Sequence, residues 1–337
     1  MNIRNRRSVC EAADRSLRQA GEDPKKLLFI YLGIVTGLSL ICSGLSVVLS
    51  NRIADTGGLS NLRLRSVLST GQTILPLIQM LAALGLEMGY ATVMLQVSRD
   101  QKVTRDALFS GFRHFFPLLW ATLLQYLLYV GVAFMCVYLS CYIFLMLPAS
   151  QPFYELVMPM VESASVLSGT IELDEATIMA AYDTMTPMLL IFVGLYLLVF
   201  VPMHYNYRMV IYCLIDQPHP RALMALHESR VMMRRNRLAL FKLDLHFWWF
   251  YALQLLIVAV CYGDLLLSLC GITLPFSGTA SYFVFLCLSL AVQFVGYYFT
   301  MNRVSVTYAT AYEALLPRQE QKPEETSAPP VPWKNQY

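Results

Sequence analysis

A long interval without cations constrains this chain more than any other feature. No lysine or arginine occurs between Arg113 and Arg208, although the segments on either side are rich in both. The interval holds two uncharged apolar stretches with an acidic stretch between them. An apolar helix of about 20 residues crosses the ~30 Å hydrocarbon core of a bilayer. The pattern therefore predicts a polytopic helical membrane protein.

The composition agrees with a membrane environment. Of the 337 residues, 57% are hydrophobic and 14% are charged, whereas soluble domains carry about 25% charged residues. A water-soluble chain of this composition has too few polar groups to cover its surface. The net charge of +3 is small, and it gives no indication of nucleic-acid binding.

Six apolar segments predict an all-α fold with six transmembrane helices. A cytoplasmic segment (1–26) precedes the transmembrane domain (27–315), and a disordered cytoplasmic tail (316–337) follows it. An acidic external loop covers 148–186. The predicted spans are 27–49, 74–97, 116–147, 187–207, 243–265 and 280–301.

The distribution of basic residues predicts the orientation of these spans. All but three of the 25 lysines and arginines lie in the N-terminal segment, in the two connections that follow the second and fourth spans, or after the sixth span. Basic residues favour the cytoplasmic side of a membrane. Both termini are therefore expected in the cytoplasm.

Two inner connections contain candidate interfacial helices. The first begins near Thr104 and has one apolar stripe at helical spacing. The second begins near Pro220, which suits a first helical turn because it has no N–H group to leave unpaired. The apolar stripe of the first comprises Leu108, Phe109, Phe112, Phe115 and Phe116.

Glu87 is the strongest single candidate for a functional group. It lies near the middle of the second predicted span, where an ionised carboxylate is costly unless it is paired or hydrated. One interpretation is a proton- or cation-responsive group that lines a cavity, together with Tyr90. The other is a neutral glutamic acid that is hydrogen-bonded to Tyr90 or to a neighbouring helix. Gly85 and Gly89 form a GxxxG pair on the opposite helix face, which suits close helix packing.

Two further clusters are candidates for ligand contacts. His204, Tyr207 and Arg208 follow Pro202, whose missing N–H frees a backbone carbonyl of the preceding turn. They either line a site or form an ordinary inner-interface belt in which Arg208 snorkels to the head groups. Arg230, Arg234 and Arg237 lie along one side of the second surface helix. These arginines either bind anionic lipid head groups or act only as a positive-inside anchor.

The sequence shows none of the common catalytic motifs. HExxH, GxSxG and GxxxxGK[ST] are missing, and neither the five histidines nor the eight cysteines have paired metal-ligand spacing. No cofactor, metal site or catalytic residue is predicted. A non-enzymatic function is favoured over an enzymatic one, and the sequence does not predict an oligomeric state.

Several motifs resemble a bacterial family of polytopic membrane proteins catalogued as domain of unknown function 975. The resemblance extends from about Ala12 to Leu316, and it implies six helices in a bacterial inner membrane. It implies no reaction. The motifs that carry it are Leu86–Tyr90, Leu108–Arg113, Pro202 with Tyr205–Met209, Asp216–Pro218, Glu228–Met233, Leu240–Leu245 and Ala311–Leu315.

Two functional hypotheses follow from these residues. The first is a membrane protein that binds or transports a small or lipid-like ligand between its helices, with contacts from Glu87 and the His204–Arg208 cluster. The second is a non-transporting scaffold that contacts anionic lipids or a protein partner through Arg230, Arg234 and Arg237.

Overall fold

The computed structural model describes residues 6–21, 23–55, 62–155, 175–217, 221–269 and 278–316, and all regular structure in them is helical. The core of the predicted acidic loop (156–174) and almost all of the predicted disordered tail (317–337) lie outside the described residues. The helices are α1 (Arg6–Gln19), α2 (Asp23–Asp55), α3 (Leu62–Ser98), α4 (Arg105–Arg113), α5 (Phe115–Met146), the 3-10 turn η2 (Pro148–Ser150), α7 (Glu175–Asn206), α8 (Val210–Asp216), α9 (Ala222–Met233), α10 (Arg237–His246), α11 (Trp248–Cys261), α12 (Gly263–Leu269) and α13 (Gly278–Leu315).

The predicted polytopic all-α fold is confirmed. Five described helices are long and apolar enough to cross a membrane, and a sixth span is present if one bent helix pair counts as a span. These helices expose large apolar side chains, for example Phe134 (71% exposed), Leu198 (72%) and Phe299 (75%). Such extensive apolar exposure requires a surrounding of hydrocarbon rather than water.

The fifth predicted span differs from a simple helix. The segment 243–265 contains a 66° bend between α10 and α11, at Phe247, whose side chain is buried. The 14 residues of α11 extend for about 21 Å, which is less than the ~30 Å core of a bilayer. Neither proline nor glycine marks the bend in the sequence, so the apolar pattern alone predicts one continuous span.

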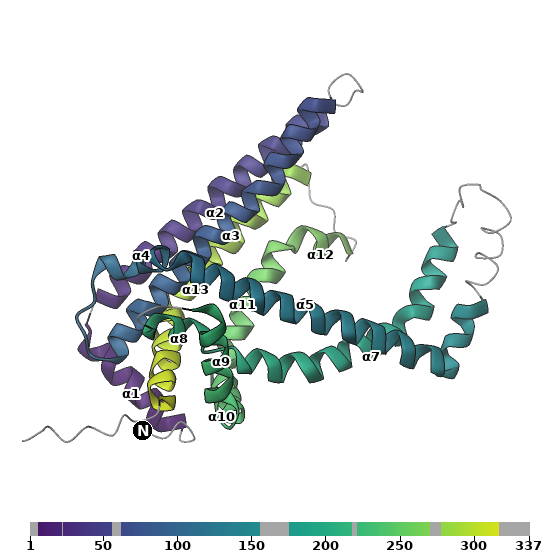
Figure 1. Ribbon diagram of the computed structural model, residues 1–337. Coiled ribbons are helices and arrows are strands. Elements are labelled where there is room, and N and C mark those ends of the chain that lie inside the picture. Colours follow the sequence, from purple (N-terminus) through teal and green to yellow (C-terminus); the bar gives the residue numbers. More distant parts are fainter. Residues whose placement is uncertain are drawn as a thin grey trace, which may run out of the picture.

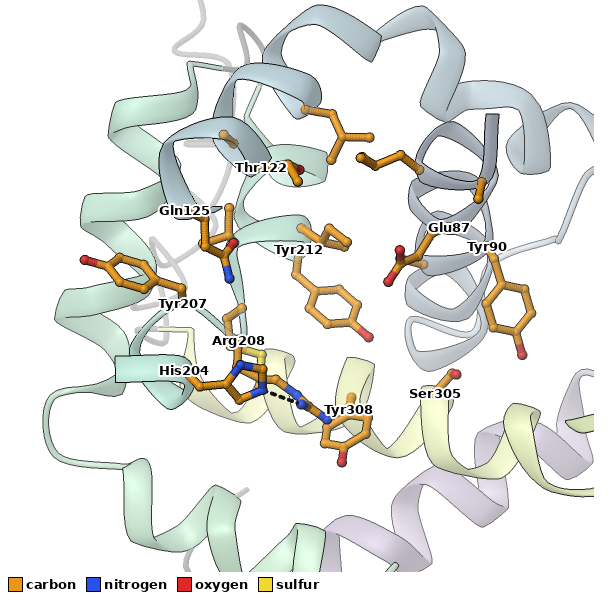
Figure 2. A pocket seen from close by; sticks show the side chains of 18 of the residues that line it. Glu87, Tyr90, Thr122, Gln125, His204, Tyr207, Arg208, Tyr212, Ser305 and Tyr308 are labelled. Carbon is orange, nitrogen blue, oxygen red and sulfur yellow. Dashed lines mark hydrogen bonds between the residues drawn. The ribbon is translucent and has the colours of Figure 1, made fainter. Parts of the chain in front are cut away.

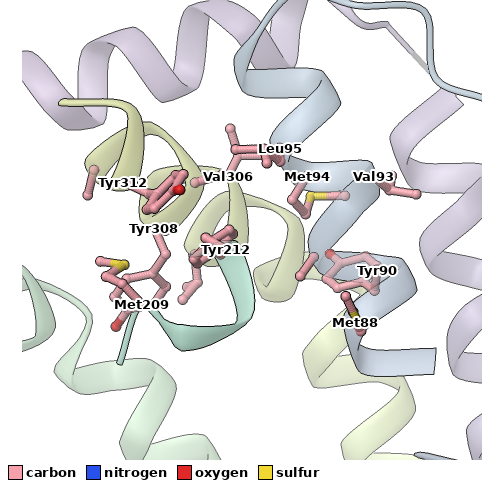
Figure 3. Close-up of a cluster of buried hydrophobic side chains, with 14 of the residues drawn as sticks. Met88, Tyr90, Val93, Met94, Leu95, Met209, Tyr212, Val306, Tyr308 and Tyr312 are labelled. Atoms are coloured by element: carbon pink, nitrogen blue, oxygen red, sulfur yellow. The ribbon is translucent and has the colours of Figure 1, made fainter. Parts of the chain in front are cut away.

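The long helices form two groups that diverge from a common base (Figure 1). One group contains α2, α3 and α13, which pack side by side, and the other is the antiparallel pair α5 and α7. The short helices α1, α4, α8, α9 and α10 gather where the two groups meet. The buried core lies at this junction and includes Met94, Leu95, Met209, Val306 and Tyr312 (Figure 3).

Close backbone packing fixes α4 against α3. A Cβ atom added to Gly89 would lie 1.7 Å from the carbonyl oxygen of Leu108, and one added to Gly111 would lie 2.0 Å from that of Gly85. The GxxxG face of α3 therefore packs closely against a helix, as its sequence predicts. The partner is the first predicted surface helix, so α4 is docked onto a span rather than only lying on a membrane surface. Leu108 is accordingly buried, whereas Phe109, Phe112 and Phe116 stay exposed.

The N-terminal segment contains a helix that the sequence pattern did not predict. Val9 and Ala13 of α1 are buried against the base of the bundle, and Arg303 of α13 donates two hydrogen bonds to Asp14, at 3.0 and 2.9 Å. Residues at positions i and i+4 share one face of a helix. The two buried residues and Asp14 thus dock α1 onto α13 near Arg303.

Candidate functional site

A cavity of about 630 Å³ lies between α3, α5, the α7–α8 junction, α11 and α13 (Figure 2). Its volume is in the usual range for sites that hold small molecules. The cavity wall is mostly apolar and includes several tyrosines. All five residues that the sequence suggested as ligand contacts line it: Glu87, Tyr90, His204, Tyr207 and Arg208.

Glu87 is open to the cavity because of its place on α3. Its neighbours Leu86, Met88 and Gly89 are buried in the helix packing, and the 100° step of a helix turns Glu87 to the remaining side. Its carboxyl points toward the middle of the cavity. Among the described residues Glu87 has no hydrogen-bond partner. Tyr90 is not a partner, because its hydroxyl donates to Asn302 Oδ1 at 2.8 Å.

Arg208 enters the same cavity from the opposite side. It lies in the short turn between the end of α7 at Asn206 and the start of α8 at Val210. Its guanidinium group donates to His204 Nε2 at 3.0 Å and to the Tyr251 hydroxyl at 3.1 Å, and it stacks 4.8 Å from the centre of the Tyr308 ring. Because arginine can only donate, Nε2 of His204 must accept, which leaves the imidazole neutral with its proton on Nδ1.

Four residues outside the predicted ligand contacts complete this polar network: Tyr205, Asp244, Tyr251 and Tyr308. Tyr251 and Tyr308 are joined through their hydroxyls at 3.1 Å, and Tyr308 also donates to Asp244. Tyr205 donates to the second oxygen of Asp244 at 2.7 Å. Asp244 is only 7% exposed, so its carboxylate has little contact with water. The network supplies hydrogen-bond donors in place of that water. The sequence carries no clear signal for this network, because Asp244 lies between Lys242 and His246 at the start of the fifth predicted span.

Tyr90 and Tyr207 contribute to the site less directly. The Tyr90 side chain is buried, it stacks on Tyr31 with ring centroids 4.9 Å apart, and its hydroxyl is bound by Asn302. The Tyr207 ring lies at the edge of the cavity and points away from Glu87. Glu87 and Arg208 therefore remain the main polar groups that face the cavity.

An ionic cluster lies beyond the cavity at the base of the bundle. Arg99 donates to Asp216 Oδ2 at 2.7 Å and to Glu313 Oε1 at 2.6 Å, and Tyr312 donates to the same Asp216 oxygen at 2.9 Å. The hydrogen bond to Asp216 is the main cause that raises the pKa of Arg99 above its ordinary value. The cluster joins the ends of α3, α8 and α13. Between it and the cavity, Tyr212 stacks on Tyr312 with ring centroids 5.3 Å apart.

The three arginines suggested as lipid contacts lie outside the cavity. Arg230 and Arg234 are exposed, whereas Arg237 is half-buried and its Nε atom has no partner among the described residues. Exposed apolar side chains lie along the same helices, including Leu223 (68% exposed), Val231 and Leu238. The described residues contain no group of three histidine, cysteine or acidic side chains that could hold a metal ion.

Comparison with known proteins identifies the family of the chain. The comparison with curated proteins found no match, and neither did the comparison with solved structures. A family model described as "Protein of unknown function (DUF975)" matches residues 1–314, which is nearly the whole chain up to the end of α13. This match agrees with the resemblance carried by the sequence motifs, and the chain therefore belongs to the DUF975 family.

Proposed function

We propose that this membrane protein binds, and moves between its helices, a small or lipid-like ligand that occupies the cavity between α3, α5, α8 and α13. The observation that carries the proposal is the convergence of Glu87 and Arg208 on one mostly apolar cavity, from helices far apart in the sequence. An apolar wall with a few convergent polar groups is the usual composition of a small-molecule site.

The free-energy cost of placing the Glu87 carboxyl inside a membrane supports this proposal. Ionisable groups inside a bilayer are expensive, and they commonly line pathways for substrates or ions. A purely structural glutamic acid would use its carboxyl in a hydrogen bond with the protein. Glu87 instead faces the cavity without such a bond among the described residues. Tyr90, one of the partners suggested for a neutral Glu87, is bound to Asn302.

Filling the cavity should remove the ligand. Ala83 lines the cavity next to Glu87 on α3, so Ala83→Phe places a ring where the ligand would lie. Native mass spectrometry of protein purified in a neutral detergent should show a bound amphipathic molecule on the wild type, reduced at least tenfold in Ala83→Phe.

Ala252→Phe is the matched control for this experiment. Ala252 is exposed on α11 and does not line the cavity, so the same added ring should leave ligand occupancy unchanged. Equal occupancy in all three proteins, or no bound molecule in the wild type, would contradict the proposed function.

The second candidate function is contact with anionic lipids through the basic inner helices. Its support is the mixture of exposed arginines with exposed apolar side chains on α9 and α10, because interfacial helices combine these two kinds of residue. In this proposal the basic ends of the spans, and both termini, lie in the cytoplasm. The family resemblance described above is the ground for placing the membrane in a bacterium.

Removing the three arginine charges tests this second candidate. Each basic residue near an anionic surface contributes about 1 kcal/mol, so Arg230→Gln, Arg234→Gln and Arg237→Gln together should weaken binding of phosphatidylglycerol about 100-fold by native mass spectrometry. The control replaces Arg7, Arg15 and Arg18 of α1, which are also exposed. The candidate fails if both triple variants lose the same amount of lipid.

A further inference from the structure

The two charges that face the cavity are not equally compensated within the protein. Arg208 has hydrogen-bond partners in His204 and Tyr251, and its guanidinium rests on the ring of Tyr308. Tyr308 in turn donates to Asp244, whose negative charge also acts on Arg208. The positive charge of Arg208 is thus balanced by a buried carboxylate that belongs to the fold.

Glu87 has neither hydrogen-bond partners among the described residues nor a counter-charge of its own. Arg208 is the cation whose field reaches it, but Asp244 already balances that charge, and Glu87 makes no hydrogen bond to any described residue. Tyr31 and Tyr212 are the other groups that interact electrostatically with Glu87, and neither carries a positive charge. An ionised Glu87 would give Arg208, Asp244 and Glu87 together one negative charge in excess, which an organic cation would neutralise.

The walls of the cavity suit an organic cation. The lining tyrosines whose rings remain for a ligand are Tyr126, Tyr129 and Tyr212. Of the other three, Tyr90 is stacked on Tyr31, Tyr207 points away from Glu87, and Tyr308 already carries the Arg208 guanidinium. The negative faces of aromatic rings attract substituted ammonium groups, and this attraction strengthens where water is excluded. Apolar side chains such as Met80, Leu84 and Leu118 line the rest of the cavity and can contact an apolar body.

We infer that the cavity accepts an amphipathic organic cation, whose ammonium group lies beside the Glu87 carboxylate and whose apolar part packs on α3 and α5. The inference rests on the function proposed above and specifies its ligand class. A hard metal cation fits less well, because it needs several oxygen ligands and the described residues offer no cluster of three acidic, histidine or cysteine groups.

Two small probes of opposite charge test the assignment. Benzyltrimethylammonium and phenylmethanesulfonate are titrated into the purified chain by calorimetry in a neutral detergent. The cation should bind the wild type at least tenfold more tightly than the anion does. Glu87→Gln should weaken binding of the cation at least tenfold, and Glu87→Asp, which keeps the charge, should retain the preference for the cation.

Two controls separate this inference from the function on which it rests. Glu155→Gln removes an exposed carboxylate far from the cavity and should bind both probes as the wild type does. Ala83→Phe should abolish binding of the cation. Thermal unfolding of each variant establishes that it is folded, and Glu87→Asp replaces Glu87→Gln as the informative variant if the latter does not fold.

The possible outcomes are distinct. Tighter binding of the anion, or equal binding of the cation by the wild type and Glu87→Gln, overturns the cation assignment. If Ala83→Phe still abolishes that binding, the cavity remains a ligand site and only the ligand class is wrong. Binding that persists in Ala83→Phe, or no binding of either probe, overturns the proposed function as well.

Discussion

Replacing Gly89 with alanine should destabilise the protein by about 3 kcal/mol, the upper end of the usual cost of overpacking. The single added carbon would lie 1.7 Å from the carbonyl oxygen of Leu108 and 2.5 Å from its carbonyl carbon. These are backbone atoms of α4, so no side-chain rotation can relieve the contact. Either α4 moves away from α3, or both helices shift.

The same substitution at Gly131 is the control. A Cβ atom on Gly131 of α5 would meet no atom within 4 Å, and alanine favours a helix over glycine by up to about 1 kcal/mol. Thermal or denaturant unfolding in detergent should therefore rank Gly131→Ala at or above the wild type and Gly89→Ala clearly below it. Equal stability of the two variants would show that α4 does not pack on α3 in this way.

The Gly89 contact also matters for the cavity. The packing of Gly85 and Gly89 against α4 fixes the rotation of α3, and that rotation directs Glu87 into the cavity. A variant that loosens α4 should therefore weaken ligand binding as well as stability. This result would show that the Gly89–Leu108 backbone contact affects the cavity, because α3 carries both Gly89 and Glu87.

Much of the fold could be predicted from the sequence, because the bilayer imposes simple rules on it. The length of each apolar stretch and the distribution of basic residues are local properties, and they predicted the membrane-spanning helices. The GxxxG face of α3 was also predictable, since only small residues allow close backbone approach. The docking of α1 was not predicted, although Val9, Ala13 and Leu17 recur every four residues and form a short apolar stripe in a polar segment.

The candidate site was predictable residue by residue but not as an arrangement. Glu87 is conspicuous as a lone acid in an apolar stretch, and Arg208 as the first base after a long interval. Their meeting in one cavity depends on the packing of α3 against α8, which no local pattern encodes. The same holds for Asp244 and Tyr308, which lie 64 residues apart and share a buried hydrogen bond. Asp244 lies at the start of the fifth predicted span, where a charged residue is ordinary.

The account depends on helices that cross a membrane, with the basic connections on one side. Figure 1 places α9, α10 and the C-terminal end of α13 together at the base, and the C-terminal end of α5 far from it. Glu155, which is exposed shortly after η2, and Arg230, which is exposed on α9, are separated by α7. They should therefore lie on opposite sides of the membrane.

Labelling of single cysteines in intact cells tests this central claim most directly. In a cysteine-free variant, Glu155→Cys should react with a membrane-impermeant maleimide on intact cells. Arg230→Cys, and Arg113→Cys at the end of α4, should react only after the membrane is permeabilised. Equal labelling of all three on intact cells, or protection of Glu155→Cys until permeabilisation, would contradict the account.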